Sequence, residues 1–290
     1  MNIGLVITTL GREHGLRRLL QSLVGQVTAG DTIVIVAQRN RAGVEQLAAE
    51  LVQLGCAIFV TTSPLGASRG RNAGVAALPE GVDFLLHFPN DTTWFPPGTL
   101  AGIRSTPPQA SAGALTVADE NGPKFQLPAP GTPLDRWNVW TVIEMGLVMR
   151  RSVFTRLGGF TESIGTGALT PWQSGEATDL LLRLIQARES ASFVWLPADV
   201  AIGGVSDPHG LSQGERRRKL RSYARGFGRV LTVWHYPLYW RAAALAGGLL
   251  FGVRNRAAFR AADGWWVFVG RLEGLTGRCF GRKTSTAVDR

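Results

Sequence analysis

Short apolar runs alternate with amphipathic segments over the first ninety residues. Four runs rich in Val, Ile, Leu and Phe predict strands, at 3–9, 31–37, 56–62 and 82–88. Apolar positions at helical spacing predict the helices between them, at 14–26, 42–55 and 68–78. Strands that are apolar on both faces and separated by helices form parallel sheets with helices packed on them. The predicted fold class is therefore α/β, with a Rossmann-like, mostly parallel central sheet and helices on both faces.

This alternation breaks after Asp91, where proline-rich loops begin. Further elements are predicted as possible strands at 112–118 and 123–127, a strand and short helix within 144–160, a helix at 174–190 and a strand at 191–197. From Ser212 onward the pattern is helical, basic and aromatic. The chain therefore divides into an α/β domain at 1–210 and a helical arm at 211–290.

The charge of the chain changes the list of expected partners. The formal net charge is +10, and the basic residues crowd the last third of the chain. Anionic lipid surfaces, nucleic acids and phosphorylated small molecules would all be attracted. Two cysteines far apart favour a reducing compartment, the first ten residues resemble a strand more than a signal peptide, and no run is long enough to cross a bilayer. We therefore expect a cytoplasmic protein.

Polar residues stand where the predicted strands end. Thr8 lies at the end of the first run, and Gln38, Ser63 and Asp91 follow the other three. In open α/β sheets, ligands bind beyond the carboxyl ends of the strands. Asp91 lies in the stretch HFPNDTTWFPPG, where it could help to bind a metal or could cap a turn.

Four stretches in a particular order carry a family resemblance, at 6–23, 66–75, 85–100 and 157–184. Together they resemble the family 2 glycosyltransferases, inverting enzymes of the GT-A fold. The resemblance covers about residues 3 to 190. It implies that a nucleotide-sugar donor binds at the strand ends and that an acceptor hydroxyl attacks the anomeric carbon of the sugar.

The resemblance also implies a set of donor-binding residues: Thr8, Arg12, Gln38, Arg69, Arg71, Asn72, Asn90 and Asp91. Arginines at a helix start suit phosphate, and the amide of Gln38 can read a base edge. The family usually has acidic residues at the end of the second strand, and this chain lacks them. The identity of the nucleotide is therefore left open.

A divalent cation, Mg²⁺ or Mn²⁺, is the cofactor that the resemblance implies, with Asp91 and His209 as its candidate ligands. The family has a run of acids where this chain has Asn90, Asp91 and Thr92. Hard cations prefer anionic oxygens, so an altered and weak metal site is expected.

Glu176 is the candidate catalytic base. The family usually shows two adjacent acids here, but Ala177 takes the second place. Ser174 is the predicted N-cap, and a helix N-terminus would keep Glu176 ionised near neutral pH. A capping carboxylate is the alternative.

Trp172 and Asp179 are the candidate acceptor-binding residues. Trp172 could stack on a sugar or lie in the core. Asp179 stands four residues before Arg183, a spacing that an exposed helical ion pair also explains.

The C-terminal arm mixes arginines with Trp and Tyr, as helices at an anionic bilayer surface do. A plain packing arm is the alternative, and no RNA-binding motif is recognised, so no nucleic-acid partner is expected.

The predicted function is sugar transfer from a nucleotide donor to a lipid-linked or polysaccharide acceptor in cell-surface glycan synthesis, at the inner face of the cell membrane. A degenerate, non-catalytic glycosyltransferase-like binding protein is the main rival. A nucleotidyltransferase and a basic binder without an active site are weaker ones.

Overall fold

The computed structural model describes residues 1–50, 54–204, 211–256 and 259–281. The chain separates into two compact units. The first comprises Met1–Ala168 and Glu176–Asp207, and the second comprises Leu169–Gly175 and Pro208–Arg290. The helical arm is thus joined in its unit by a short segment, residues 169–175, that precedes the predicted base.

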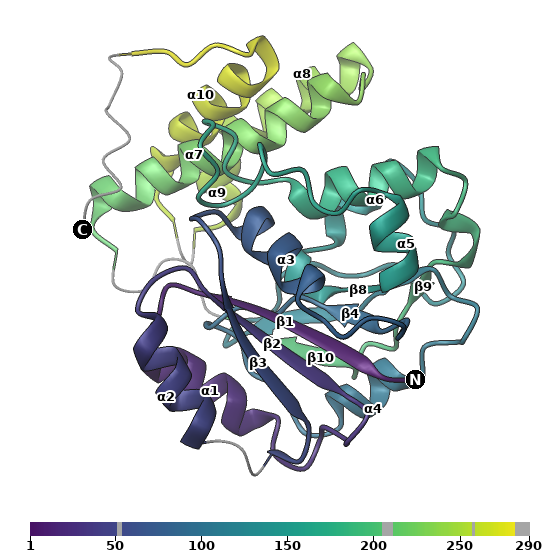
Figure 1. The fold of residues 1–290 in the computed structure, drawn as a ribbon. Helices are drawn as coiled ribbons and strands as arrows, with labels where there is room; N and C mark the ends of the chain where they lie inside the picture. The colour runs from purple at the N-terminus through teal and green to yellow at the C-terminus, as the bar shows by residue number, and fades with distance from the viewer. Residues whose placement is uncertain (51–53, 205–210, 257–258, 282–290) are drawn as a thin grey trace. The chain divides into compact units, whose positions relative to one another are not determined.

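A seven-stranded sheet forms the centre of the first unit (Figure 1). Its strands, in spatial order, are β3 (Ala57–Thr62), β2 (Thr32–Ala37), β1 (Ile3–Thr9), β4 (Leu85–His87), β8 (Leu147–Arg150), β5 (Ala112–Ala114) and β9 (Val194–Trp195). The first four are parallel, β8 runs antiparallel to both of its neighbours, and β9 is parallel to β5. The predicted mostly parallel sheet is confirmed.

Helices cover both faces of this sheet, as predicted (Figure 1). One face carries α1 (Glu13–Ser22), α2 (Arg41–Glu50) and α4 (Thr99–Arg104). The other face carries α3 (Ala67–Ala76), α5 (Arg151–Arg156) and α6 (Glu176–Gln186). The central strands β1 and β2 are buried along their whole length, whereas residues of the edge strand β3 are partly exposed.

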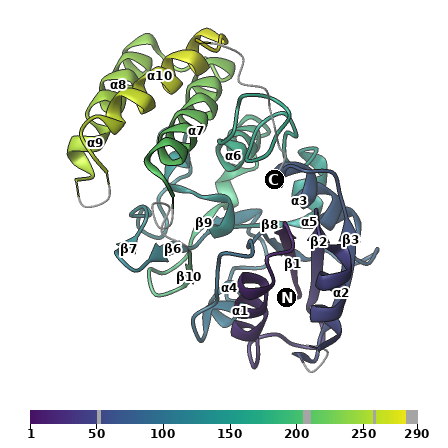
Figure 2. The same ribbon diagram turned by 90° about the vertical axis from the view of Figure 1, so that its left-hand side faces the viewer.

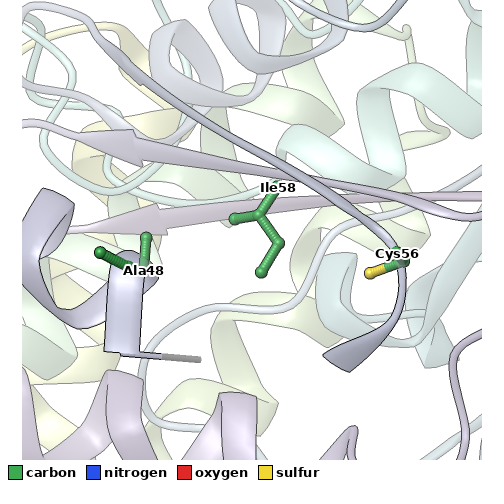
Figure 3. Close-up of a pocket in the computed structure, with 4 residues that line it drawn as sticks. Ala48, Cys56 and Ile58 are labelled. Atoms are coloured by element: carbon green, nitrogen blue, oxygen red, sulfur yellow. The ribbon is translucent and has the colours of Figure 1, made fainter. Parts of the chain in front are cut away.

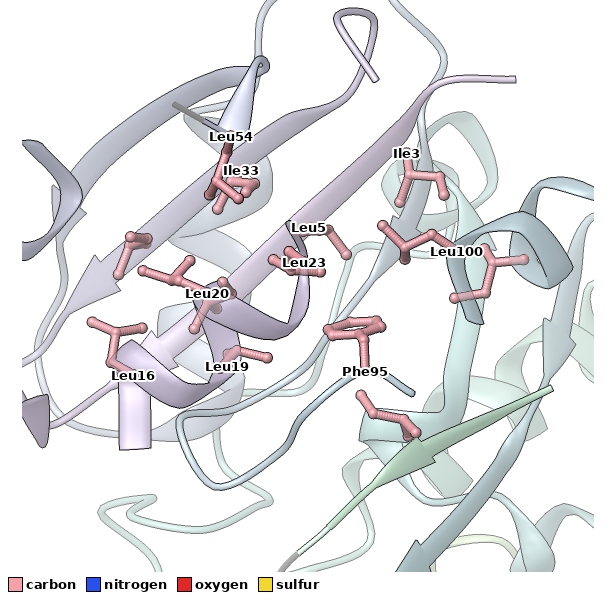
Figure 4. Packing of buried hydrophobic residues seen from close by; sticks show 14 of the residues in the cluster. Ile3, Leu5, Leu16, Leu19, Leu20, Leu23, Ile33, Leu54, Phe95 and Leu100 are labelled. Carbon is pink, nitrogen blue, oxygen red and sulfur yellow. The ribbon is translucent and has the colours of Figure 1, made fainter. Parts of the chain in front are cut away.

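Alternate residues of β1 contribute to a large buried core. Ile3, Leu5 and Ile7 are fully buried in one cluster with Leu16, Leu19 and Leu20 of α1 and with Leu23, which directly follows the helix. Figure 4 shows Ile3 and Leu5 in this cluster. Each buried leucine of this kind stabilises the fold by about 1.5–3 kcal/mol relative to exposure. The periodic pattern of α1 is therefore explained by one-sided packing.

On the opposite face, glycines bring α3 unusually close to the sheet. A Cβ on Gly74 would lie 2.3 Å from Val6 Cγ1, and one on Gly70 would lie 2.7 Å from Thr8 Cγ2. Only a residue without a side chain permits this approach. The glycines of the SRGRNAG stretch thus set the distance between the helix and the strand ends.

The predicted strand at 112–118 is in fact two strands in different sheets. β5 belongs to the central sheet, whereas β6 (Thr116–Asp119) forms a small second sheet with β7 (Gly122–Pro123) and β10 (Ala201–Gly203). The predicted strand at 123–127 was wrong beyond Pro123, because residues 124–127 form no ladder. Short apolar runs do not reveal such a change of sheet.

Within the described ranges, the second unit contains four helices besides the segment 169–175: α7 (Gln213–Val233), α8 (Leu238–Leu249), α9 (Phe251–Arg254) and α10 (Asp263–Thr276). Figures 1 and 2 show α7, α8 and α10 side by side. Ser212 and Glu215 form a capping box at the start of α7, and Asp263 and Glu273 of α10 are buried against α7 arginines. None of the helices within the described ranges has the length and hydropathy of a bilayer-spanning segment.

Candidate active site

The carboxyl ends of β1 and β4 are joined beyond the regular ladder. Thr8 pairs with Asn90 in an isolated parallel bridge, which extends the strand pairing up to the polar stretch. Thr9 and Asp91 follow directly on the two chains. The polar residues that were predicted at the strand ends therefore lie side by side here.

Asp91 is held by the chain itself. Its carboxylate accepts hydrogen bonds from Arg12 Nη2 at 2.5 Å and Nε at 3.1 Å, and from Thr9 Oγ1 at 2.7 Å. The Asp91 side chain is 1% exposed, whereas that of Arg12 is 59% exposed. A buried anion thus anchors a guanidinium that faces solvent.

Asn90 and Thr92 close a local turn. Asn90 Oδ1 accepts from the Thr92 backbone N–H at 3.0 Å and from the Thr92 hydroxyl at 2.5 Å. The Asn90 carbonyl accepts from Thr93 Oγ1 at 2.7 Å. Both neutral oxygens that could have replaced the missing acids are engaged within the turn.

This donor set does not fit a divalent cation. Mg²⁺ and Mn²⁺ are held by several oxygens, at least one of them usually a free carboxylate, yet both oxygens of Asp91 are taken up by Arg12 and Thr9. Across the residues that the structure describes, no three His, Cys, Asp or Glu side chains gather as metal ligands would. The second predicted ligand, His209, lies outside the described residues.

Arg71 lies buried between two carboxylates. Its Nη1 is 3.3 Å from Glu176 Oε1 and its Nη2 is 3.4 Å from Glu144 Oε1. Its guanidinium also lies over the Phe160 ring, 5.5 Å from the centroid, and its buried Nε has no hydrogen-bond partner in the described structure. The residue predicted to bind phosphate is thus placed to hold acidic side chains.

Glu176 is the first residue of α6 and its side chain is 4% exposed. Burial, and after it the charge of Glu144, raise the pKa of Glu176 to about 7, against the opposing effect of Arg71. The expectation that the helix N-terminus keeps this carboxylate fully ionised was incomplete, because desolvation dominates. A carboxyl that titrates near 7 suits a general base.

Ser174 is not the N-cap of α6. Gly175 precedes the helix with a φ of +101°, and the Ser174 hydroxyl donates to the Tyr223 carbonyl within the second unit. Ser174 stands one residue before the true N-cap position. The sequence does not show this difference, because the backbone geometry decides which residue caps the helix.

Glu144 was missed in the sequence. It lies in a short 3₁₀ turn, Glu144–Gly146, just before β8, and its side chain is 21% exposed. The antiparallel placement of β8 beside β4 brings this turn to the strand ends. Glu144 could have been predicted as a site residue only if the order of the strands had been known.

The remaining residues predicted to bind the donor have partners of their own. Gln38 Nε2 donates to Ser63 Oγ at 3.0 Å and to the carbonyls of Pro64 and Gly66, Arg69 pairs with Glu162, and Asn72 exchanges two 2.8 Å hydrogen bonds with the Phe160 backbone. These bonds fix the loops around the start of α3.

The two predicted acceptor residues fall in different units. Asp179 in α6 accepts from Thr161 Oγ1 and forms the ion pair with Arg183 that the spacing suggested, but Asp179 is buried and not exposed as expected. Trp172 belongs to the second unit, where Arg229 lies over its ring at 5.4 Å.

Two pockets accompany these features. One, of about 300 Å³, is lined by Arg12, His14, Gly15, Arg18, Asp91, Thr92 and Thr93. The other, of about 240 Å³, is lined by Ala48, Ala49, Cys56 and Ile58 (Figure 3). The second carries no chemistry, because its only reactive group is Cys56, whose pKa burial raises to about 11.

Several solved structures share this architecture, although no protein-family model matches the chain and no curated protein matches it in sequence. Residues 1–349 of S. aureus TarS are similar at 13% identity and a TM-score of 0.56, over 97% of this chain and 93% of that one. A mannosyltransferase from Pyrobaculum calidifontis, in complex with GDP-Man and Mn²⁺, is similar at 13% identity and a TM-score of 0.59, over 94% of this chain and 86% of that one.

The chain shares the fold of TarS and of this mannosyltransferase. TarS has also been solved in complex with UDP-GlcNAc, at 12% identity to this chain and a TM-score of 0.55. Both neighbours therefore hold nucleotide sugars on a fold of this GT-A-like kind. At these identities the likeness establishes the architecture, and the chemistry has to be argued from the residues.

Proposed function

We propose that the chain is an inverting glycosyltransferase of the family 2 type, which moves a sugar from a nucleotide-sugar donor to a hydroxyl of a saccharide acceptor in cell-surface glycan synthesis. The supporting observation is the buried ion pair of Arg71 and Glu176, in a fold shared with glycosyltransferases that hold UDP-GlcNAc and GDP-Man. A carboxyl with a pKa of about 7 in such a fold suits proton removal from an alcohol.

In the proposed reaction, Glu176 takes the proton of the acceptor hydroxyl. The freed oxygen bonds to the anomeric carbon as the bond from that carbon to the diphosphate oxygen breaks, which inverts the configuration. The nucleoside diphosphate leaves with the electron pair. Arg71 holds the Glu176 carboxylate in place and limits the rise of its pKa.

For the donor, we propose that the nucleotide lies across the strand ends beside Thr8, Gln38 and the start of α3. Arg69 and Asn72 shape the loops there through their bonds to Glu162 and Phe160. For the acceptor, Asp179 is a proposed contact within the first unit, and Trp172 is a separate proposed contact within the second.

The leaving diphosphate needs positive charge beside it. Two sources come into question: a divalent cation, as Mn²⁺ accompanies GDP-Man in the mannosyltransferase structure, and an arginine of this chain. The carboxylate of Asp91 is already occupied by Arg12 and Thr9, which favours the arginine.

We further propose that the second unit binds the surface of an anionic membrane, at its inner face, where a lipid-linked acceptor would be found. Residues 211–290 contain 16 Lys and Arg but four Asp and Glu, whereas residues 1–210 contain 15 and 17. The whole net positive charge of the protein thus resides in the helical unit. Its fully buried Asp263 and Glu273 pair with four arginines of α7, and the count stays strongly positive with these pairs included.

Exposed apolar side chains accompany this charge. In the second unit they are Leu169, Val233, Leu238, Tyr239, Leu249, Leu250, Val253, Trp265 and Phe280. Cationic surfaces with exposed Trp, Tyr and Leu bind the interface of anionic bilayers.

A non-catalytic binding protein is the second candidate, favoured by Ala177 and by the closed turn at Asn90–Thr92. Calorimetry with UDP- and GDP-sugars, followed by mass spectrometry of acceptor glycans, separates the two. Our proposal requires both binding and transfer, with transfer lost and donor binding kept in Glu176→Gln. Binding without transfer under all conditions would establish the binding protein.

Membrane binding is tested by co-sedimentation of the full chain with vesicles of phosphatidylglycerol or phosphatidylcholine. We expect binding to the anionic vesicles, weakened in Trp265→Asp but kept in Phe59→Asp, an exposed apolar residue of the first unit. Equal retention by both vesicle types, or preference for RNA over vesicles, would overturn the proposed membrane attachment.

A further inference from the structure

The positive charge beside Asp91 is the guanidinium of Arg12, a residue of the chain itself. The fork of Arg12 meets the carboxylate with Nε and Nη2, so two of its five N–H groups are used. Three N–H groups stay available on a side chain that is 59% exposed. Arg12 is thus anchored on one edge and open to a ligand on the other.

The pocket beside Arg12 is basic. Its volume is about 300 Å³, and its charged lining consists of Arg12, Arg18 and the neutralised Asp91. Arg18 is held over the Trp94 ring, 3.9 Å from the centroid, which fixes a second guanidinium without a carboxylate partner in the described structure. Thr92 and Thr93 also line the pocket, but their hydroxyl and backbone N–H groups already donate to Asn90, so the two arginines are its available charged donors.

Planar guanidinium groups bind phosphate oxygens with paired hydrogen bonds, and an anchored arginine loses little freedom when it does so. Asp91 sets the orientation of Arg12 and carries no free oxygen of its own. A divalent cation at Asp91 would have to displace Arg12, leaving a guanidinium next to the metal charge.

We propose that this pocket binds the diphosphate of the donor and that Arg12, with Arg18, supplies the positive charge that a metal supplies elsewhere, so that binding is independent of divalent cations. Asp91 acts here as a positioning residue and not as a metal ligand. This inference rests on the proposed function for the identity of the ligand, but the pocket itself is testable with simpler anions.

The experiment is calorimetry of the full chain with inorganic pyrophosphate and with UDP and GDP, each in excess EDTA and in Mn²⁺. We expect dissociation constants that agree within about twofold between the two conditions. Arg12→Ala should weaken binding by about tenfold or more, because charge-assisted hydrogen bonds are lost. Arg17→Ala is the matched control on the same helix, since Arg17 is paired with Glu13 and Glu50, and should bind as the wild type does.

Two further variants keep the test decisive if Arg12→Ala does not fold. Arg12→Lys keeps the charge but loses the fork, and Asp91→Asn keeps the shape but loses the anchor. Both should fold, with unchanged far-ultraviolet circular dichroism, and weaken pyrophosphate binding severalfold in EDTA.

Binding that appears only with Mn²⁺ and is abolished by EDTA would overturn the inference while leaving sugar transfer possible. The inference also fails if Asp91→Asn removes binding and Arg12→Lys does not. Conversely, pyrophosphate binding without any nucleotide-sugar binding or transfer would leave the pocket intact and defeat the proposed function.

Discussion

Arg71 of α3 and Glu176 of α6 form an ion pair of 3.3 Å in which both side chains are at most 4% exposed. Such a pair costs desolvation on both sides, and its Coulomb attraction offsets that cost only with good geometry. Here Arg71 is shared with Glu144, so one positive charge serves two carboxylates. The excess negative charge, added to burial, is what keeps Glu176 near its titration point at neutral pH.

Glu144→Gln should therefore shift the acid limb of the transfer rate to lower pH. Removing the Glu144 charge takes away one cause of the raised pKa of Glu176, so the base becomes ionised at lower pH. The pH dependence of kcat, measured between about pH 5 and 9, checks this. Loss of all turnover in Glu144→Gln, with full activity in Glu176→Gln, would instead make the more exposed Glu144 the base.

Arg71→Met should move the same limb in the opposite direction. Arg71 lowers the pKa of Glu176, and without it the carboxyl stays protonated to higher pH. Activity at pH 7 should fall and partly recover near pH 9. An unchanged limb in a folded variant, judged by its melting temperature, would show that Glu176 is not the titrating base.

Much of the first unit could be predicted because it follows from periodicity. The apolar residues of β1, β2 and their helices recur at regular spacing, so the sequence predicts these elements and their buried faces. Parallel pairing then predicts that the residues at the ends of β1 and β4 lie close together. Glu144 could not be found in this way, because its position depends on β8 being inserted antiparallel between β4 and β5.

The sequence also could not predict which partners the charged side chains have. Arg71 and Arg12 both suit phosphate by type, yet one is buried between carboxylates and the other is exposed beside Asp91. Burial and partner choice depend on three-dimensional neighbours, which a linear motif does not contain.

Gly74→Ala should destabilise the first unit by about 1–3 kcal/mol, the cost of overpacking a core. The added methyl would meet Val6 Cγ1 at 2.3 Å and Val36 Cγ2 at 2.9 Å. Chemical denaturation of both proteins measures the difference. Gly214→Ala is the control, because nothing lies within 4 Å of its added Cβ in α7, and it should be neutral or stabilising by up to about 1 kcal/mol.

His87 should make the fold sensitive to acid. It is fully buried in β4 with Nδ1 donating to the Leu147 carbonyl, and burial lowers its pKa to about 4 from the ordinary 6.5. Between pH 6.5 and 4, His87 is therefore protonated in the unfolded chain but stays largely neutral in the folded chain. The free energy of unfolding falls by about 3 kcal/mol over this range.

The test compares His87→Met with the wild type by denaturation at several pH values. Relative to the wild type, the variant should gain stability as the pH falls from 6.5 to 4. His14→Met, at an exposed histidine, is the control and should follow the wild-type curve. Parallel curves for His87→Met and the wild type would contradict the assignment.

Glu273→Gln should weaken the helical unit by about 3 kcal/mol, because it breaks a buried ion network on one side. Glu273 is fully buried in α10 and accepts from Arg221 and Arg225 of α7, at 2.5 and 2.6 Å. Its loss leaves two arginines facing each other with no charge between them. Thermal unfolding followed by circular dichroism should show a lower melting temperature, and anionic vesicles should raise that temperature again by binding the arginines.

The matched control for this network is Glu215→Gln, at the exposed capping box of α7, which should cost at most about 1 kcal/mol. Both variants remove one carboxylate from the helical unit, so they raise its net charge equally and differ only in burial. Equal losses in the two variants would mean that the Glu273 network contributes no more than a helix cap, and that the positive surface is tolerated without it.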